Sequence, residues 1–94
     1  MVKLNGKKKL RVSVFISGRG TNLKSLINFS KKKNSRIRIN LIISNNKDAN
    51  GLQFAKKNNI NFLIVNYKSK KNAEKKILDV LKKNNIDLVC LAGF

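Results

Sequence analysis

Residues 15–23, FISGRGTNL, contain the groups in this sequence best suited to chemistry. They follow an apolar run and open a predicted helix, where free backbone N–H groups and the helix dipole favour a bound anion. Gly18 and Gly20 allow backbone conformations, and a close approach to the anion, that a Cβ would block. Thr21 and Asn22 can add side-chain donors or cap the helix. The segment predicts a phosphate-binding turn, and a purely structural strand-to-helix turn is the alternative.

The turn differs from both standard nucleotide-binding motifs. The dinucleotide fingerprint G-x-G-x-x-G would need a third glycine at position 23, where Leu23 stands. The P-loop would need G-K-[ST], which is absent from the sequence. We therefore expect a phosphate ester that is smaller than a dinucleotide or a nucleoside triphosphate.

The remaining reactive residue types are few. The chain has no His and a single cysteine, Cys90, which lies in an apolar run and is predicted to be a buried core thiol. Of the four acids, Asp48 is predicted to cap a helix, Glu74 and Asp79 to lie on a helix surface, and Asp87 to precede a strand. These residues form neither a carboxylate pair for acid–base catalysis nor a zinc or iron–sulfur ligand set. We expect no metal.

Alternating strand and helix patterns run along the chain. Strands are predicted at 10–16, 36–44, 60–65 and 88–91, and helices at 21–29, at about 49–55 with fraying at 56–59, and at 72–83. Residues 1–9 are interpreted as a short basic lead into the first strand. The order βαβαβαβ predicts an α/β fold with a Rossmann-like parallel sheet. Its ligand should bind beyond the carboxyl ends of the strands, near 17–22, 44–48, 66–70 and 92–94.

The net charge of +18 has two interpretations. It could serve nucleic-acid or anionic-membrane binding, or lysine and asparagine could simply occupy surface positions. Arginine and aromatic residues, which recognise bases, are sparse. We therefore favour the second interpretation and expect no nucleic-acid partner. No apolar run of about 18 residues is present, so no membrane span is expected either.

Four segments in order resemble the folate-dependent phosphoribosylglycinamide formyltransferases. VFISGRGTNLKSLI is similar to the first strand, glycine turn and first helix of that family. LIISNNKDANGLQFAKKNNI is similar to its second strand, Ser-Asn turn and second helix, and YKSKKNAEKKIL to the segment that leads into the third helix. DLVCLAGF is similar to the fourth strand with its Leu-Ala-Gly-Phe ending. The resemblance covers residues 10–94.

The resemblance implies a reaction and a set of binding residues. The family transfers a formyl group from 10-formyltetrahydrofolate to the amino group of glycinamide ribonucleotide in purine synthesis, a cytoplasmic activity that uses no metal. Its glycine turn binds the ribonucleotide phosphate, a role that falls here on Gly20, Thr21 and Asn22. A family arginine that helps to bind folate is matched by Lys70, which keeps the charge without the two-pronged fork.

The resemblance also implies what lies outside these residues. The family continues past Leu-Ala-Gly-Phe to a catalytic Asn, His and Asp, and no counterpart of these is found here, so we predict no catalytic residue in this chain. Residues 10–94 are expected to form the N-terminal, substrate-phosphate-binding half of the domain, marginally folded and inactive alone. The fourth strand should then have an apolar edge without its partner strand. The alternatives are a fragment of the related formyltetrahydrofolate deformylase and a free-standing basic nucleic-acid-binding module. The oligomeric state does not follow from the sequence.

Overall fold

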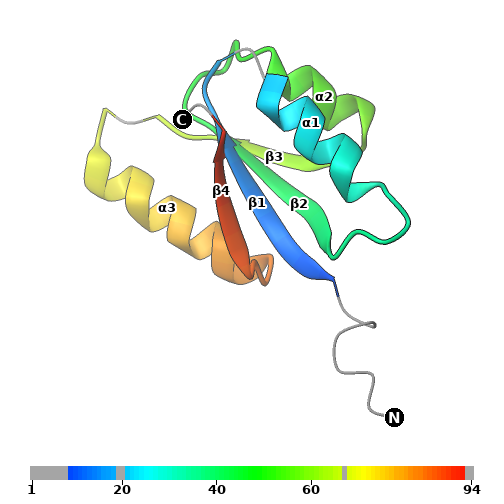
Figure 1. The fold of residues 1–94 in the computed structure, drawn as a ribbon. Coiled ribbons are helices and arrows are strands. Elements are labelled where there is room, and N and C mark those ends of the chain that lie inside the picture. Colours follow the sequence, from blue (N-terminus) through cyan, green and yellow to red (C-terminus); the bar gives the residue numbers. More distant parts are fainter. Residues whose placement is uncertain (1–8, 19–20, 67, 93–94) are drawn as a thin grey trace.

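The computed structural model describes residues 9–18, 21–66 and 68–92, with Thr21 described by its backbone alone. Strands and helices alternate along the chain, as the sequence pattern predicts (Figure 1). The elements are β1 (Leu10–Ile16), α1 (Thr21–Ser30), β2 (Ile37–Ser44), α2 (Gly51–Lys57), β3 (Asn61–Ile64), α3 (Lys70–Lys83) and β4 (Leu88–Ala92).

The described strands form one parallel sheet in the order β3-β2-β1-β4. The pairing of β1 with β2 shifts register between Val12 and Ser13, which marks a bulge in the centre of the sheet. Because all the strands run the same way, their carboxyl ends meet at one edge of the sheet. The predicted α/β class with a Rossmann-like parallel sheet is confirmed.

Helices cover both faces of the sheet (Figure 1). On one face α1 and α2 pack over Val12, Val14 and Ile16 of β1. On the other face α3 packs through Ala73 and Ile77 over a second cluster. β1 and β2 are buried on both sides, which explains why their sequences become continuous apolar runs instead of alternating patterns.

Several predicted boundaries differ from the structure. Asp48 is not a helix cap, because α2 begins at Gly51 with Asn50 in the N-cap position. Thr21 and Asn22, the expected caps of the first helix, both lie within the first turn of α1. The α3 helix begins at Lys70, two residues earlier than expected. Its two leading lysines carry no apolar signal that would have marked this start.

The predicted fraying at 56–59 is wrong, because α2 ends in a well-formed stop. Asn58 donates its side-chain amide to the Phe54 carbonyl at 2.8 Å, and Asn59 has a left-handed φ of 56°. The Asn59 backbone N–H then donates to the Lys56 carbonyl at 3.3 Å, and the Ile60 backbone N–H donates to the Ala55 carbonyl at 2.9 Å. This is the Schellman arrangement, in which carbonyls left free by the last turn find donors.

The α3 helix ends in the same way, on the same five letters. The sequence KKNNI occurs at 56–60 and again at 82–86. Asn84 donates to the Val80 carbonyl at 2.8 Å, Asn85 has φ of 54°, and Ile86 N–H donates to the Leu81 carbonyl at 3.0 Å. Each copy turns the chain from a helix into the following strand.

A reciprocal pair of hydrogen bonds fixes the start of β4 beside β1. The Arg11 backbone N–H donates to the Asp87 carboxylate at 2.8 Å, and the Asp87 backbone N–H donates to the Arg11 carbonyl at 2.8 Å. Asp87 therefore stands at the entry to the strand, as expected. Beyond it β4 forms one edge of the sheet among the described residues, with Leu88, Val89 and Leu91 exposed and Leu91 at 71%.

Candidate functional site

The topology marks one place on the sheet edge where a ligand site is expected. From β1 the chain proceeds through α1 to β2 on one side, whereas β4 is reached through α3 on the other face of the sheet. The strand order therefore reverses between β1 and β4. In open α/β sheets, ligands bind outside the carboxyl ends of the strands at such a switch point. The glycine turn leaves β1 at this point.

The described part of the glycine turn is open. Ser17 is half-buried and Gly18 is exposed. A Cβ built on Gly18 would meet nothing within 4 Å, and its φ lies outside the left-handed region. The expectation that Gly18 is needed for its backbone conformation is therefore not supported. Gly20, the other predicted glycine of the site, lies outside the described residues.

The first turn of α1 carries the other two predicted phosphate ligands. Thr21 is the first residue of α1, and Asn22 follows with an exposed side chain. No acidic side chain lies in this turn, so nothing in it would repel an anion. The backbone N–H groups of a helix's first turn have no partner within the helix and suit a phosphate.

An asparagine that the site prediction did not single out connects the glycine turn to the next loop. Asn46 follows β2 and donates its side-chain amide to the Ser17 carbonyl at 3.2 Å. Its oxygen accepts from the Asp48 backbone N–H at 2.9 Å, and its own N–H donates to the buried Ser44 hydroxyl at 3.0 Å. The Ser-Asn turn was visible in the sequence, but its bond to Ser17, 29 residues away, was not.

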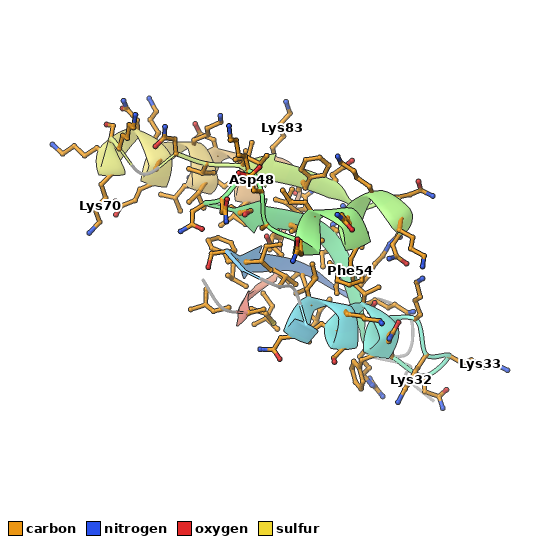
Figure 2. The ribbon with its side chains drawn as sticks, turned by 90° about the horizontal axis from the view of Figure 1, so that it is seen from above. Lys32, Lys33, Asp48, Phe54, Lys70 and Lys83 are labelled. Carbon is orange, nitrogen blue, oxygen red and sulfur yellow. The ribbon has the colours of Figure 1, made fainter. Side chains whose placement is uncertain are left out.

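The predicted folate-binding residue lies at the start of α3. Lys70 is exposed at the first position of that helix, on the face of the sheet opposite α1 (Figures 1 and 2). The preceding loop is shaped by Asn66, whose side-chain oxygen accepts from the Lys68 backbone N–H at 2.9 Å. Thr21 and Asn22 are thus adjacent in the structure, whereas Lys70 approaches the same edge from the other layer.

The described residues of the site offer backbone N–H, amide and ammonium groups. Within the described ranges, His, Cys, Asp and Glu form no group of three that could hold a metal ion. Cys90 is a free thiol, half-buried against the α1–α2 core and not fully buried as predicted. The described helices include none long and apolar enough to cross a membrane. The arrangement can hold an anion at the edge of the sheet.

The fold defines a doubly wound α/β protein whose glycine turn lies at the switch point of the sheet. Comparison with known proteins gives the family: residues 10–94 match the family model described as "Formyl transferase". The chain belongs to this family. It is 43% identical over 91 residues to the human trifunctional purine biosynthetic protein adenosine-3, covering 94% of this chain and 9% of that protein. It is 36% identical to the phosphoribosylglycinamide formyltransferase of Haemophilus influenzae, covering 89% and 41%.

Solved structures agree with the fold. The phosphoribosylglycinamide formyltransferase of Anaplasma phagocytophilum superposes with a TM-score of 0.81 at 44% identity, over 93% of this chain and 41% of that one. The enzyme of Brucella melitensis gives a TM-score of 0.88 at 32% identity, over 93% and 47%. This chain therefore spans less than half the length of these relatives.

Proposed function

We propose that this chain is the substrate-binding part of a phosphoribosylglycinamide formyltransferase. This enzyme transfers a formyl group from 10-formyltetrahydrofolate to glycinamide ribonucleotide in purine biosynthesis. One observation carries the proposal: the glycine turn leaves β1 at the β1–β4 switch point of a formyl transferase fold. The names of the relatives support the reaction, and a cytoplasmic setting is part of the proposal.

In this proposal the ribonucleotide phosphate is held by Gly20, Thr21 and Asn22. Backbone N–H groups at the start of α1 donate to the phosphate oxygens, the helix dipole adds to the attraction, and the Asn22 amide supplies a further donor. Asn46 stabilises the turn by donating its side-chain amide to the Ser17 carbonyl. Lys70 contacts the folate co-substrate through its ammonium group, where the family uses arginine.

We assign residues 10–94 to the N-terminal, substrate-phosphate-binding half of the domain, with residues 1–9 as a basic lead. The family's catalytic Asn, His and Asp follow the Leu-Ala-Gly-Phe segment, and this sequence contains no His. These residues are therefore proposed to bind substrate without catalysing its formylation. Formyl transfer catalysed by the purified chain alone would contradict this part of the proposal.

Calorimetric titration with glycinamide ribonucleotide tests the phosphate turn. Asn22→Ala should weaken binding about tenfold, because it removes a hydrogen bond to a charged group. Gly20→Val should abolish binding by blocking the approach of the backbone to the phosphate. Asn28→Ala, an exposed asparagine further along α1, is the matched control and should bind as the parent does. Equal binding by all three variants would rule out the assignment of the turn.

A further inference from the structure

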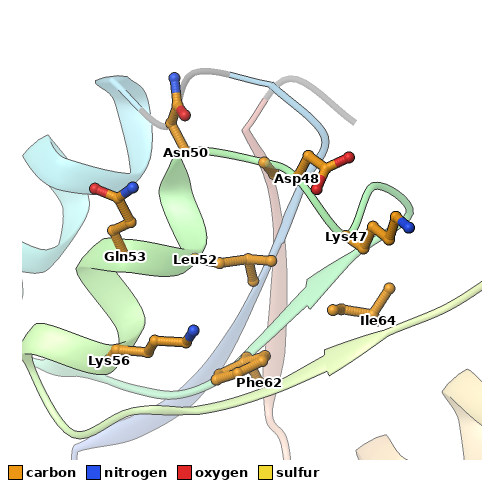
Figure 3. A pocket seen from close by; sticks show the side chains of 9 residues that line it. Lys47, Asp48, Asn50, Leu52, Gln53, Lys56, Phe62 and Ile64 are labelled. Atoms are coloured by element: carbon orange, nitrogen blue, oxygen red, sulfur yellow. The ribbon is translucent and has the colours of Figure 1, made fainter.

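A pocket lies two strands away from the switch point, between α2 and the outer edge of β3 (Figure 3). Its volume is about 290 Å³, at the lower end of the range typical for small-molecule sites. Its wall consists of Lys47, Asp48, Ala49, Asn50, Leu52, Gln53, Lys56, Phe62 and Ile64. The proposed formyltransferase function leaves it without a role.

The inner part of this pocket is apolar and accessible. Leu52 projects from α2 toward the sheet, and Phe62 and Ile64 project from alternate positions of β3 toward it (Figure 3). Phe62 and Ile64 are each 38% exposed, although they lie in a strand of the sheet. An aromatic or aliphatic ligand would cover this surface, and binding would be favoured because the exposed apolar area is removed from water.

The charged groups of the pocket favour a negative ligand. The Lys56 ammonium lies 5.8 Å from the centre of the Phe62 ring, so a cation is already held above the apolar surface. Lys47 adds a second cation and Asp48 the only carboxylate of the lining, which leaves an excess of one positive charge. An anionic group paired with Lys56 would therefore sit beside the ring and the aliphatic side chains, at the boundary between the two kinds of surface.

The α2 side of the lining also offers side-chain amides. The side-chain amides of Asn50 and Gln53 form part of the α2 wall, and neither makes a hydrogen bond within the described ranges. Each amide can both donate and accept, which suits the edge of a heteroaromatic ring. The pocket thus combines a flat apolar surface, a cation next to it and amides at the side.

We propose that this pocket binds a small aromatic anion of mononucleotide size, independently of the substrate site at the switch point. The aromatic ring packs against Phe62, Ile64 and Leu52. The anionic group pairs with Lys56, and Lys47 strengthens the attraction from the loop that follows β2. Adenosine monophosphate is a suitable probe, because adenosine and ribose 5-phosphate each lack one of the two recognised parts.

Calorimetric titration of the purified protein with these three compounds tests the proposal. The mononucleotide should bind at least tenfold more tightly than adenosine or ribose 5-phosphate, since both parts of the pocket are needed. Phe62→Leu and Lys56→Gln should each weaken its binding about tenfold. Equal affinities for the mononucleotide and ribose 5-phosphate would overturn the proposal, because simple attraction to phosphate would then suffice.

The chain offers closely matched controls. Lys57→Gln removes the same charge one residue further along α2, outside the pocket lining. Phe29→Leu removes a ring that also has a lysine above it, Lys32 at 5.8 Å, on the exposed surface of α1. Both controls should bind the mononucleotide as the parent does. If they weaken binding as much as the pocket variants do, the proposal is wrong.

Amide chemical shifts of the unmodified protein give a test that needs no variant. On addition of the mononucleotide, shifts should concentrate at 47–56 and 62–64, the segments that line the pocket. Shifts confined to the first turn of α1 would place the ligand at the switch point and overturn the proposal. Chemical-shift changes limited to that turn would instead support the proposed phosphate site. The experiment therefore distinguishes failure of the pocket proposal from failure of the phosphate-site proposal.

Discussion

Asparagine side chains make the connections that hold the loops of this protein. Asn46 links the loop after β2 to the carbonyl of Ser17, and Asn58 and Asn84 close the ends of two helices. A carboxamide has both donors and an acceptor, so one residue can connect two backbone segments at once. At the residue scale, these asparagines therefore stabilise the structure and do not merely occupy a solvated surface.

Replacing Asn46 should loosen the edge of the sheet that carries the proposed phosphate site. Asn46→Ala removes a side-chain amide that makes two hydrogen bonds, with the Asp48 backbone N–H at 2.9 Å and the Ser17 carbonyl at 3.2 Å. We expect the free energy of unfolding to fall by about 1–2 kcal/mol, measured by urea denaturation. The neighbouring Asn45→Ala is the control, because its exposed side chain makes no hydrogen bond in the described part of the chain. An equal effect of the two changes would contradict this role.

At the scale of elements, the sequence predicted the strands better than the helix ends. The bounds of β1 match, since its β-branched residues first alternate and then form an apolar run. The start of α2 was missed because Asp48 has the residue type of a cap, while the structure places it in a turn formed by the Asn46 side chain, ahead of the N-cap Asn50. Side chains that bond locally to the backbone compete in this way with helix capping. The bond between Asn46 and Ser17 depends on the tertiary fold, so no local pattern could have revealed it.

The two KKNNI stops give a prediction for these helix ends. Asn59 and Asn85 adopt left-handed φ angles, which cost an L-residue free energy that glycine does not pay. Asn59→Gly and Asn85→Gly should each raise the free energy of unfolding by up to about 1 kcal/mol, measured as an increase in the urea midpoint. Asn58→Gly and Asn84→Gly are the controls and should destabilise, because each removes a side-chain hydrogen bond to the preceding turn. Destabilisation by all four changes would refute this account of the stops.

At the scale of the whole molecule, charge and an open sheet edge dominate the expected behaviour. A net charge of +18 on 94 residues keeps copies apart through mutual repulsion. The exposed apolar side chains of β4 favour association, since β4 forms an edge of the sheet in the described part of the chain and such an edge can pair with another strand. Solubility should therefore fall as ionic strength rises, because salt screens the repulsion between copies while leaving the apolar edge unchanged.

The same charge allows the nucleic-acid alternative to be tested directly. If lysine only occupies surface positions, random-sequence duplex DNA should bind at about 20 mM salt and dissociate near about 150 mM, measured by fluorescence anisotropy. Specific recognition needs arginine forks or aromatic stacking, and this chain has four arginines and few aromatic residues. Sub-micromolar binding that persists at physiological salt would favour the nucleic-acid module. Heparin, a polyanion without bases, serves as the control for charge alone.

The paired helix stops have a consequence at the level of the gene. Glycine is the usual residue for a left-handed helix end, and all of its codons begin with two guanines. Asparagine can be encoded by AAT, which uses neither guanine nor cytosine, and it tolerates the same backbone conformation. A coding sequence drawn strongly toward adenine and thymine could thus lose glycines at these positions and still end its helices at the same residues.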